Sequence, residues 1–211
     1  MTVTHEDLTL DWLGYATLRI ERDDGFVAYL DPGRYGVLTG EWTPDTDGIA
    51  HPEGTDYDAR DGDLVCVTHD HHYDSDGIQR VAHEDATVVV YEGVDAKNID
   101  RDVLAVDDLP YSVRRIETNE QYDATDTVRI RALPAYNHPD GPNTAADGTP
   151  FHPEGFGCGY LLSFGDDESS VLWPGDSDAL ADHASLDPTV FAPPIGRSFT
   201  MDRHEAADLA T

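Results

Sequence analysis

The chain places a dense group of potential metal ligands directly after a run of apolar residues. Residues 64–68 read as a buried β-strand, and the next segment, residues 69–74, contains three histidines and two aspartates. Residues 77–83 then predict a short helix, and residues 87–91 predict another strand. This β-loop-α-β order is typical of a mixed α/β fold. It sets the histidine-rich segment at the carboxyl end of a buried strand, where such folds place their chemistry.

The remaining apolar segments extend this pattern to both halves of the chain. Further strands are expected at residues 8–13, 16–20, 26–30, 112–116, 128–133, 159–164, 171–173 and 190–192. Short turns separate the first three of them, so the chain is expected to begin as an antiparallel sheet. Asp202 and Glu205 form an Asp-x-x-Glu capping box, which predicts a helix start. The chain has 211 residues, of which 39% are hydrophobic, so we expect a single domain over residues 1–211.

A metal centre needs ligands from more than one segment, and two later segments offer them. His152 ends a polar loop before the strand expected at residues 159–164, and Asp176 follows an apolar run and a Pro-Gly pair. The glycine allows a tight turn that would put the Asp176 carboxylate at its tip. Imidazole and carboxylate groups together suit zinc, manganese and iron(II). We expect one or two zinc ions, with Mn²⁺ or Fe²⁺ as the alternatives.

Acidic residues outnumber basic ones by 43 to 13, which gives a formal net charge of −30. Nucleic acids and anionic membrane surfaces are therefore excluded as partners, because binding to them depends on clustered Lys and Arg. Aspartate is the main acid, Lys97 is the single lysine, and the acids are spread along the chain. We interpret this composition as halophilic, because molar salt would screen the self-repulsion. A role for the acids in binding a ligand or partner is the alternative.

The order of these segments resembles that of the metallo-β-lactamase superfamily. Six short motifs carry the resemblance: Leu13-Gly14, Asp31-Pro32, Pro134 to Asn137, His152 to Tyr160, Pro174 to Asp178 and Pro194 to Met201. Within the superfamily, the chain is similar to a branch of metal-dependent hydrolases related to the ascorbate-6-phosphate lactonases. The resemblance covers nearly the whole chain. It implies a four-layer αββα sandwich with a metal centre at its edge.

The resemblance also implies roles for individual residues. His69, His71 and His152 correspond to the ligands of the first metal ion. Asp176 corresponds to the carboxylate that bridges the two metal ions. Asp74 corresponds to the aspartate of the second metal ion, where it would also orient water and accept its proton as a general base. His72 is a further candidate ligand of the second ion.

The chain departs from the family pattern H-x-H-x-D-H. One extra residue separates His71 from Asp74, and Ser75 then stands where the family has a histidine. A register that starts at Asp70 and uses His72 is the alternative. Members of the family continue past the C-terminal helix into a strand with one more histidine. The resemblance therefore implies a domain shortened at its C-terminal end.

Together, the residues and the resemblance predict a metal-dependent hydrolase. A metal-bound hydroxide would attack a lactone, ester or phosphoester. Tyr136 and His138 precede the His152 loop and are candidates to contact the substrate or the leaving group. A non-catalytic metal- or ligand-binding protein with a degenerate second metal site is the alternative, because Ser75 lacks a ligand nitrogen. The first residues show no export signal, so we expect a cytoplasmic protein with a small-molecule substrate, as a monomer or homo-oligomer.

Overall fold

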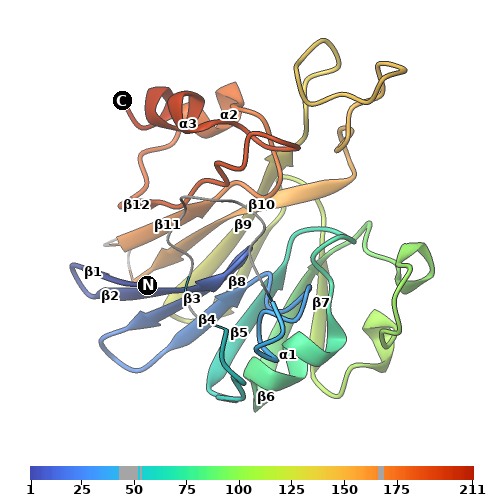
Figure 1. Ribbon diagram of the computed structural model, residues 1–211. Helices are drawn as coiled ribbons and strands as arrows, with labels where there is room; N and C mark the ends of the chain where they lie inside the picture. Colours follow the sequence, from blue (N-terminus) through green and yellow to red (C-terminus); the bar gives the residue numbers. More distant parts are fainter. Residues whose placement is uncertain (43–51, 53, 166–168) are drawn as a thin grey trace. The chain divides into compact units, whose positions relative to one another are not determined.

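The computed structural model describes residues 1–42, 52, 54–165 and 169–211, which form two compact units. Unit 1 consists of Met1–Val90 and Val94–Arg115, and unit 2 of Tyr91–Gly93 and Ile116–Thr211. Each unit is built on one β-sheet and carries a few short helices (Figure 1). Among the residues that the structure describes, no helix is long and apolar enough to cross a membrane.

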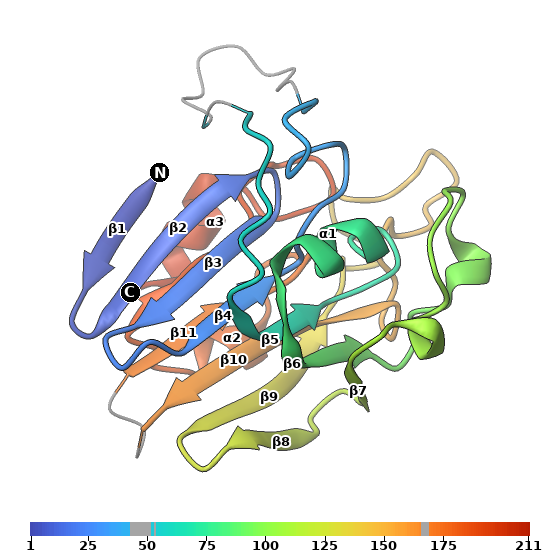
Figure 2. The same cartoon turned by 90° about the horizontal axis from the view of Figure 1, so that it is seen from below.

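Unit 1 is built on a seven-stranded sheet whose strands follow one another in chain order, from β1 to β7 (Figure 2). Their bounds are Thr2–His5, Leu8–Gly14, Thr17–Arg22, Val27–Leu30, Gly62–Val67, Ala82–Tyr91 and Ser112–Ile116. Neighbouring strands from β1 to β4 are antiparallel, whereas β5 is parallel to β4 and to β6. The predicted antiparallel start and the β-loop-α-β order are therefore confirmed.

Strand β5 contributes a continuous run of buried residues to the unit 1 core. Leu64, Val65, Cys66 and Val67 are all fully buried, the pattern of a strand with parallel neighbours and both faces covered. Helix α1 (Ser75–Val81) follows β5 and contacts it. Two short 3-10 helices, η1 (Ala96–Asn98) and η2 (Val106–Asp108), come after β6.

Helix α1 approaches the segment after β4 so closely that Gly77 has no room for a side chain. A Cβ atom at this position would lie 2.4 Å from the Pro32 carbonyl oxygen and 2.7 Å from the Gly33 Cα. Both distances are below any contact that a real Cβ makes with backbone. The absence of a side chain at Gly77 therefore permits backbone-to-backbone packing at this point.

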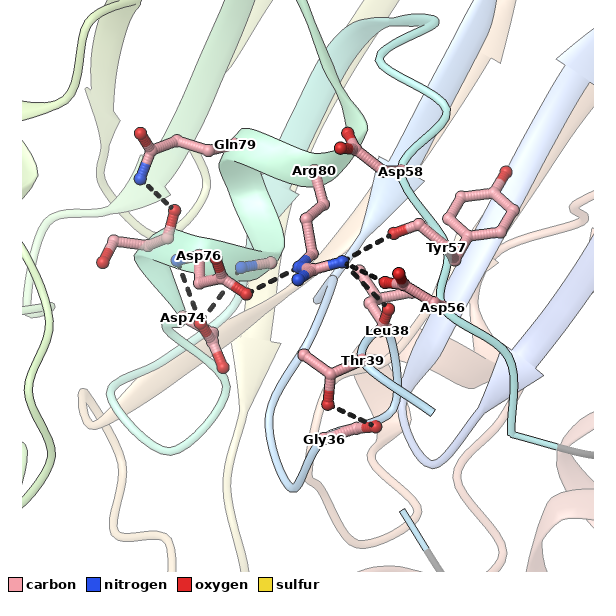
Figure 3. A network of polar contacts seen from close by, with 12 residues as sticks. Gly36, Leu38, Thr39, Asp56, Tyr57, Asp58, Asp74, Asp76, Gln79 and Arg80 are labelled. Carbon is pink, nitrogen blue, oxygen red and sulfur yellow. Dashed lines mark hydrogen bonds and ion pairs between the residues drawn. The ribbon is translucent and has the colours of Figure 1, made fainter. Parts of the chain in front are cut away.

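Arg80 ties the last turn of α1 to two other segments of unit 1 (Figure 3). Its Nε donates to Asp76 on the same helix at 2.7 Å, and its Nη1 donates to Asp56 at 2.7 Å. The same Nη1 lies 3.4 Å from the carbonyl oxygens of Leu38 and Tyr57. These contacts fix α1, and with it the loop that leads into the helix.

Unit 2 is built on a five-stranded sheet with the strand order β12-β11-β10-β9-β8. In chain order, β8 to β12 span Gln121–Thr125, Val128–Ala135, Gly157–Phe164, Ser169–Trp173 and Val190–Phe191. Only β11 and β12 pair in parallel among these strands. Helices α2 (Ala181–Ala184) and α3 (Arg203–Leu209) follow β11 and β12. The fold is thus mixed α/β with two sheets and few helices, as predicted, whereas the single domain expected over residues 1–211 stays a prediction.

Candidate functional site

The carboxyl ends of the parallel strands β4 and β5 place Asp31 beside Thr68. Asp31 directly follows β4 and has a left-handed backbone conformation (φ 46°), which aspartate adopts more readily than most residues. Its N–H donates to the Cys66 carbonyl oxygen at 2.9 Å. Its carboxylate accepts from the Thr68 N–H at 2.8 Å and from Thr68 Oγ1 at 2.9 Å. A carboxylate on a residue that is only 2% exposed therefore anchors the start of the histidine loop, residues 69–74.

Two histidines of the histidine loop are oriented through this carboxylate. His72 Nδ1 lies 3.0 Å from Asp31 Oδ2. His69 Nδ1 lies 2.8 Å from Thr68 Oγ1, which itself donates to Asp31. When Nδ1–H donates to Asp31 or Thr68, Nε2 is the nitrogen that would bind a metal ion. Both histidines are buried, and their neighbours select the tautomer that metal-ligating histidines use.

The third histidine of the loop lies next to the first. The ring centroids of His69 and His71 are 5.2 Å apart, and those of His69 and His72 are 4.3 Å apart. His71 is exposed, whereas the other two are buried. All three belong to the side chains of the described residues that could hold a metal ion. The loop therefore gathers three of the predicted ligands within unit 1.

Asp74, predicted as a metal ligand and base, caps helix α1 in the structure. Its Oδ1 accepts from the backbone N–H groups of Asp76 and Gly77, each at 3.1 Å. Its Oδ2 accepts from the backbone N–H of Arg34 at 2.9 Å. Because of this cap, the helix begins at Ser75, two residues before the start predicted from the sequence. The catalytic role of Asp74 stays a prediction.

Other polar side chains of this segment hold it against later parts of unit 1. Asp70 accepts a hydrogen bond from the Asp95 N–H at 2.8 Å. Ser75 Oγ accepts one from the Leu104 N–H at 2.9 Å. The Tyr73 hydroxyl donates to the Leu104 carbonyl oxygen at 2.9 Å, and burial raises the pKa of Tyr73 to about 12. These side chains make structural contacts.

Unit 2 brings His152 and Asp176 together at one edge of its sheet. β9 ends at Ala135 opposite the start of β10, and the antiparallel pairing of β10 with β11 puts the end of β11 at the same edge. His152 Nε2 lies 3.6 Å from Asp176 Oδ2. One ion with bonds of about 2.0–2.2 Å can span that distance. Both residues belong to the side chains that could hold a metal ion.

Two glycines allow the turn that carries Asp176. Gly175 has φ 65°, in the left-handed region that favours glycine, and it directly precedes Asp176. Gly159 in β10 faces the same turn, where a Cβ atom would lie 2.7 Å from the Pro174 carbonyl oxygen. The close packing of β10 against this turn fixes the position of the Asp176 backbone.

A buried amide network holds His152. Asn137 Oδ1 accepts from the His152 N–H at 2.9 Å and lies 3.3 Å from His152 Nδ1. Asn137 Nδ2 donates to Asp178 Oδ1 at 3.0 Å, and this oxygen also accepts from Asn143 at 2.5 Å. A hydrogen bond at Nδ1 again makes Nε2 the ligand nitrogen. His152 therefore repeats, in unit 2, the arrangement of His69 and His72 in unit 1.

Tyr136 and His138 follow β9 on either side of Asn137. Their rings meet edge to face with centroids 5.7 Å apart. Asp178 fixes both backbones, because its N–H donates to the Tyr136 carbonyl oxygen at 3.0 Å and its carboxylate accepts the His138 N–H at 2.8 Å. Tyr136 is half-buried and His138 is exposed. Contact of either side chain with a substrate stays a prediction.

The residues that orient the histidines were not singled out for this role from the sequence. These are Asp31, Thr68 and Asn137. A signal existed for the first two, since each directly follows an apolar strand, but only the parallel pairing of β4 with β5 shows that they meet. The buried imidazoles of His69 and His72 in unit 1, and that of His152 in unit 2, each have Nδ1 close to an oxygen, so each leaves Nε2 as a possible ligand for a divalent metal such as zinc.

Comparison with known proteins agrees with this fold. The family model described as the β-lactamase superfamily domain matches residues 9–211. A comparison with curated protein sequences finds no significant match. Among solved structures, a candidate metal-dependent hydrolase from Parabacteroides distasonis ATCC 8503 superposes with a TM-score of 0.70 at 21% identity. It covers 100% of this chain and 82% of that chain.

Two further solved structures are similar in fold. A possible metal-dependent hydrolase from Veillonella parvula DSM 2008 has a TM-score of 0.60 and 18% identity, and isothiocyanate hydrolase from Delia radicum gut bacteria has 0.58 and 16%. Each match covers 92% of this chain and 77% of the other. At these low sequence identities, the three structures show that the fold is shared. The family model, which matches nearly the whole chain, shows the family. The chain belongs to the β-lactamase superfamily.

Proposed function

We propose that this protein is a metal-dependent hydrolase that acts on a small-molecule lactone, ester or phosphoester. The observation that carries the proposal is the set of buried imidazoles whose Nδ1 atoms are held by Thr68, Asp31 and Asn137. These hydrogen bonds fix one tautomer and one ring orientation and leave Nε2 as the possible metal ligand. Membership of the β-lactamase superfamily and neighbours named as metal-dependent hydrolases support the same function.

The proposed metal is zinc, bound as one or two ions, with Mn²⁺ or Fe²⁺ as alternatives. The proposed ligands are His69, His71, His72, Asp74, His152 and Asp176. When bound, such a cation lowers the pKa of a coordinated water to about 7 and polarises a carbonyl or phosphoryl oxygen. The protein's own contribution would be to hold the imidazoles of His69, His72 and His152 through Nδ1, which leaves Nε2 to bind the metal ion. Asp176 adds negative charge beside His152 Nε2.

Three further residues have proposed roles in catalysis. Asp74 would accept a proton from the attacking water, for which its carboxylate must leave at least one of its present hydrogen bonds. The Tyr136 hydroxyl and the His138 imidazole would contact the substrate or the leaving group. Asp178 holds the backbones of both residues, so their side chains start from fixed positions.

A non-catalytic metal-binding protein is the second candidate function. The observation in its favour is that Asp74 and Ser75 make structural hydrogen bonds around the first turn of α1. Both residues stand where the resemblance implies ligands of a second metal ion. A protein that keeps only the remaining ligands would still bind a metal ion, without turnover.

Metal content and hydrolysis distinguish these functions. Purified full-length protein is expected to retain at least one zinc, manganese or iron ion per chain, measured by elemental analysis, and to hydrolyse members of a lactone, ester and phosphodiester panel. His69→Ala and His152→Ala should each lower metal content and abolish hydrolysis. The matched control is His83→Ala, because the exposed imidazole of His83 accepts just the Asp85 N–H, at 3.3 Å, among the residues that the structure describes.

The outcomes separate cleanly. A wild-type chain that holds no metal overturns both functions. Metal retention without hydrolysis of any substrate supports the binding protein and overturns the hydrolase. If only one of the two histidine variants loses metal, the ligands belong to the unit that contains the substituted histidine.

We further propose that the chain falls in the branch of the superfamily related to the ascorbate-6-phosphate lactonases, and that it works in the cytoplasm of a salt-adapted cell. The motifs from Pro134 to Asn137 and from Pro174 to Asp178 support the branch. The net charge of −30 supports the salt-rich environment.

A further inference from the structure

Two arginines of unit 1 are attached to the histidine loop. Arg101 donates from Nη2 to the carbonyl oxygen of Tyr73 at 2.7 Å and lies 3.4 Å from that of His71. Arg34 follows β4, and its backbone N–H donates to Asp74 at 2.9 Å. Both guanidinium groups therefore belong to segments that are fixed to the loop carrying the proposed ligands.

The Arg34 guanidinium is unlike other arginines of this acidic chain. Arg19 and Arg80 each donate to carboxylate oxygens at 2.6–2.7 Å. Among the described residues, no carboxylate forms an ion pair with Arg34, and its buried Nε has no hydrogen-bond partner. Its guanidinium instead lies over the Tyr35 ring, 4.3 Å from the centroid. An unpaired donor on a positive group that is partly withdrawn from water is costly unless an acceptor arrives.

Arg34 and Arg101 both lie beside the carboxylate of Asp74. Asp74 Oδ2 accepts the Arg34 backbone N–H at 2.9 Å and forms an ion pair with Arg101 Nη1 at 3.8 Å, a distance too long for a hydrogen bond. Two like charges held near one another favour a bound anion that would neutralise both.

A row of aromatic rings leads from this pair to a proposed metal ligand. Arg34 lies over Tyr35, the Tyr35 and Tyr15 rings are 5.0 Å apart, and the Tyr15 and His72 rings are 5.6 Å apart. Tyr35 is 57% exposed, so the row is open to solvent at the arginine end. If the anionic group of a substrate binds the two arginines, the rest of the substrate can contact these aromatic rings.

We propose that Arg34 and Arg101 form an oxyanion-binding subsite that takes the carboxylate or phosphate group of the substrate. This inference rests on the proposed hydrolase function and narrows its substrates to negatively charged lactones, esters or phosphoesters. Guanidinium groups suit both anions, because their N–H donors match paired oxygen atoms. The subsite binds the part of the substrate that does not react.

Anion binding by the full-length protein tests the subsite independently of turnover. Inorganic phosphate and acetate are titrated separately by calorimetry at constant KCl into wild type, Arg34→Met and Arg101→Met. The Arg34 side chain makes no hydrogen bond to the residues that the structure describes, so Arg34→Met should remove the charge and keep the fold. A thermal melt checks both variants. We expect each variant to bind the preferred anion roughly tenfold more weakly, as loss of one charge-assisted contact predicts.

Arg60→Met is the matched control. Arg60 also has a left-handed backbone (φ 50°, against 55° for Arg34), but its side chain is exposed and paired with Asp58. This variant should bind both anions like the wild type. Stronger binding of phosphate than of acetate identifies a phosphorylated substrate, and the reverse a carboxylate.

Two results would overturn the subsite. One is a wild-type protein that binds neither anion. The other is a folded Arg34→Met protein that binds both as the Arg60→Met control does. If anion binding depends on the arginines while no substrate is hydrolysed, the subsite holds and the hydrolase function fails.

Discussion

At the scale of single residues, Asp31 determines how the histidine loop is presented. Its buried carboxylate accepts hydrogen bonds from the Thr68 N–H and hydroxyl and lies 3.0 Å from His72 Nδ1. A charged group in that position needs these donors to offset its loss of hydration. In return it sets the tautomers of two imidazoles, because the Thr68 hydroxyl that donates to Asp31 is left to accept from His69.

Asp31→Asn is therefore expected to weaken metal binding by about 10–100-fold, the usual effect of losing such an orienting group. An asparagine amide has only one acceptor atom, and its NH₂ group would oppose the donors of Thr68 and His72. Competition with a chromophoric chelator measures the affinity. Asp63→Asn is the control, because Asp63 lies on β5 and, within the described part of the chain, its carboxylate accepts just the Val27 N–H at 2.9 Å. Equal affinities in the two variants would refute the orienting role.

At the scale of elements, helix α1 couples the fold of unit 1 to the proposed chemistry through Asp74. As an N-cap, Asp74 can be replaced by asparagine with little loss, whereas alanine costs about 0.5–2 kcal/mol. We expect Asp74→Asn to keep the free energy of unfolding but to lose hydrolysis, and Asp74→Ala to lower both. Urea unfolding and the substrate panel measure these two effects.

The matched cap is Asp202, which begins α3 and accepts the N–H groups of His204 and Glu205. Asp202→Ala should lower stability and leave hydrolysis unchanged. Full hydrolysis by the Asp74→Asn protein would show that the aspartate only caps the helix and takes no part in catalysis.

Most of the elements found from the sequence bury apolar residues, as β4 and β5 do. Residues 112–116 were predicted with the bounds that β7 has, and the capping box of α3 is present as expected. The edge strands β1 and β8 were missed. β1 is exposed throughout and β8 alternates between exposed and half-buried positions, so neither shows an apolar run. Helix α2, with four residues, is too short to carry a periodic pattern.

The site was predictable to the same extent. Histidines that cluster in the sequence, such as His69, His71 and His72, could be found because their spacing is local. The roles of Asp31 and Asn137 in orienting histidines depend on strand pairing and on a loop that returns to β9, which no local pattern encodes. The extra residue in the histidine loop leaves two registers open, one that starts at His69 and one that starts at Asp70 and uses His72, and the sequence does not show that Asp74 caps α1.

At the scale of the whole molecule, the net charge of −30 predicts how stability depends on salt. Self-repulsion is strong in dilute buffer and is screened at molar salt, where the Debye length is about 3 Å. We expect the unfolding temperature to rise by roughly 10 °C or more between 0.1 M and 3 M KCl, equivalent to several kcal/mol for a chain of this size. Calorimetric or fluorescence melts measure the shift. Full stability in dilute buffer would contradict adaptation to high salt.

The backbone contact between Gly77 and Pro32 has a mechanical consequence. Residues with proposed roles in the site lie on either side of this contact: Asp31 and Arg34 flank Pro32 and Gly33, and Asp74 caps the helix. A methyl group at position 77 would clash with the Pro32 carbonyl oxygen. Because this oxygen is a backbone atom, the clash could be relieved only by moving helix α1 and the Pro32 segment apart. The proposed orientation of His72 by Asp31 and the proposed anion binding by Arg34 therefore depend on the same close backbone contact.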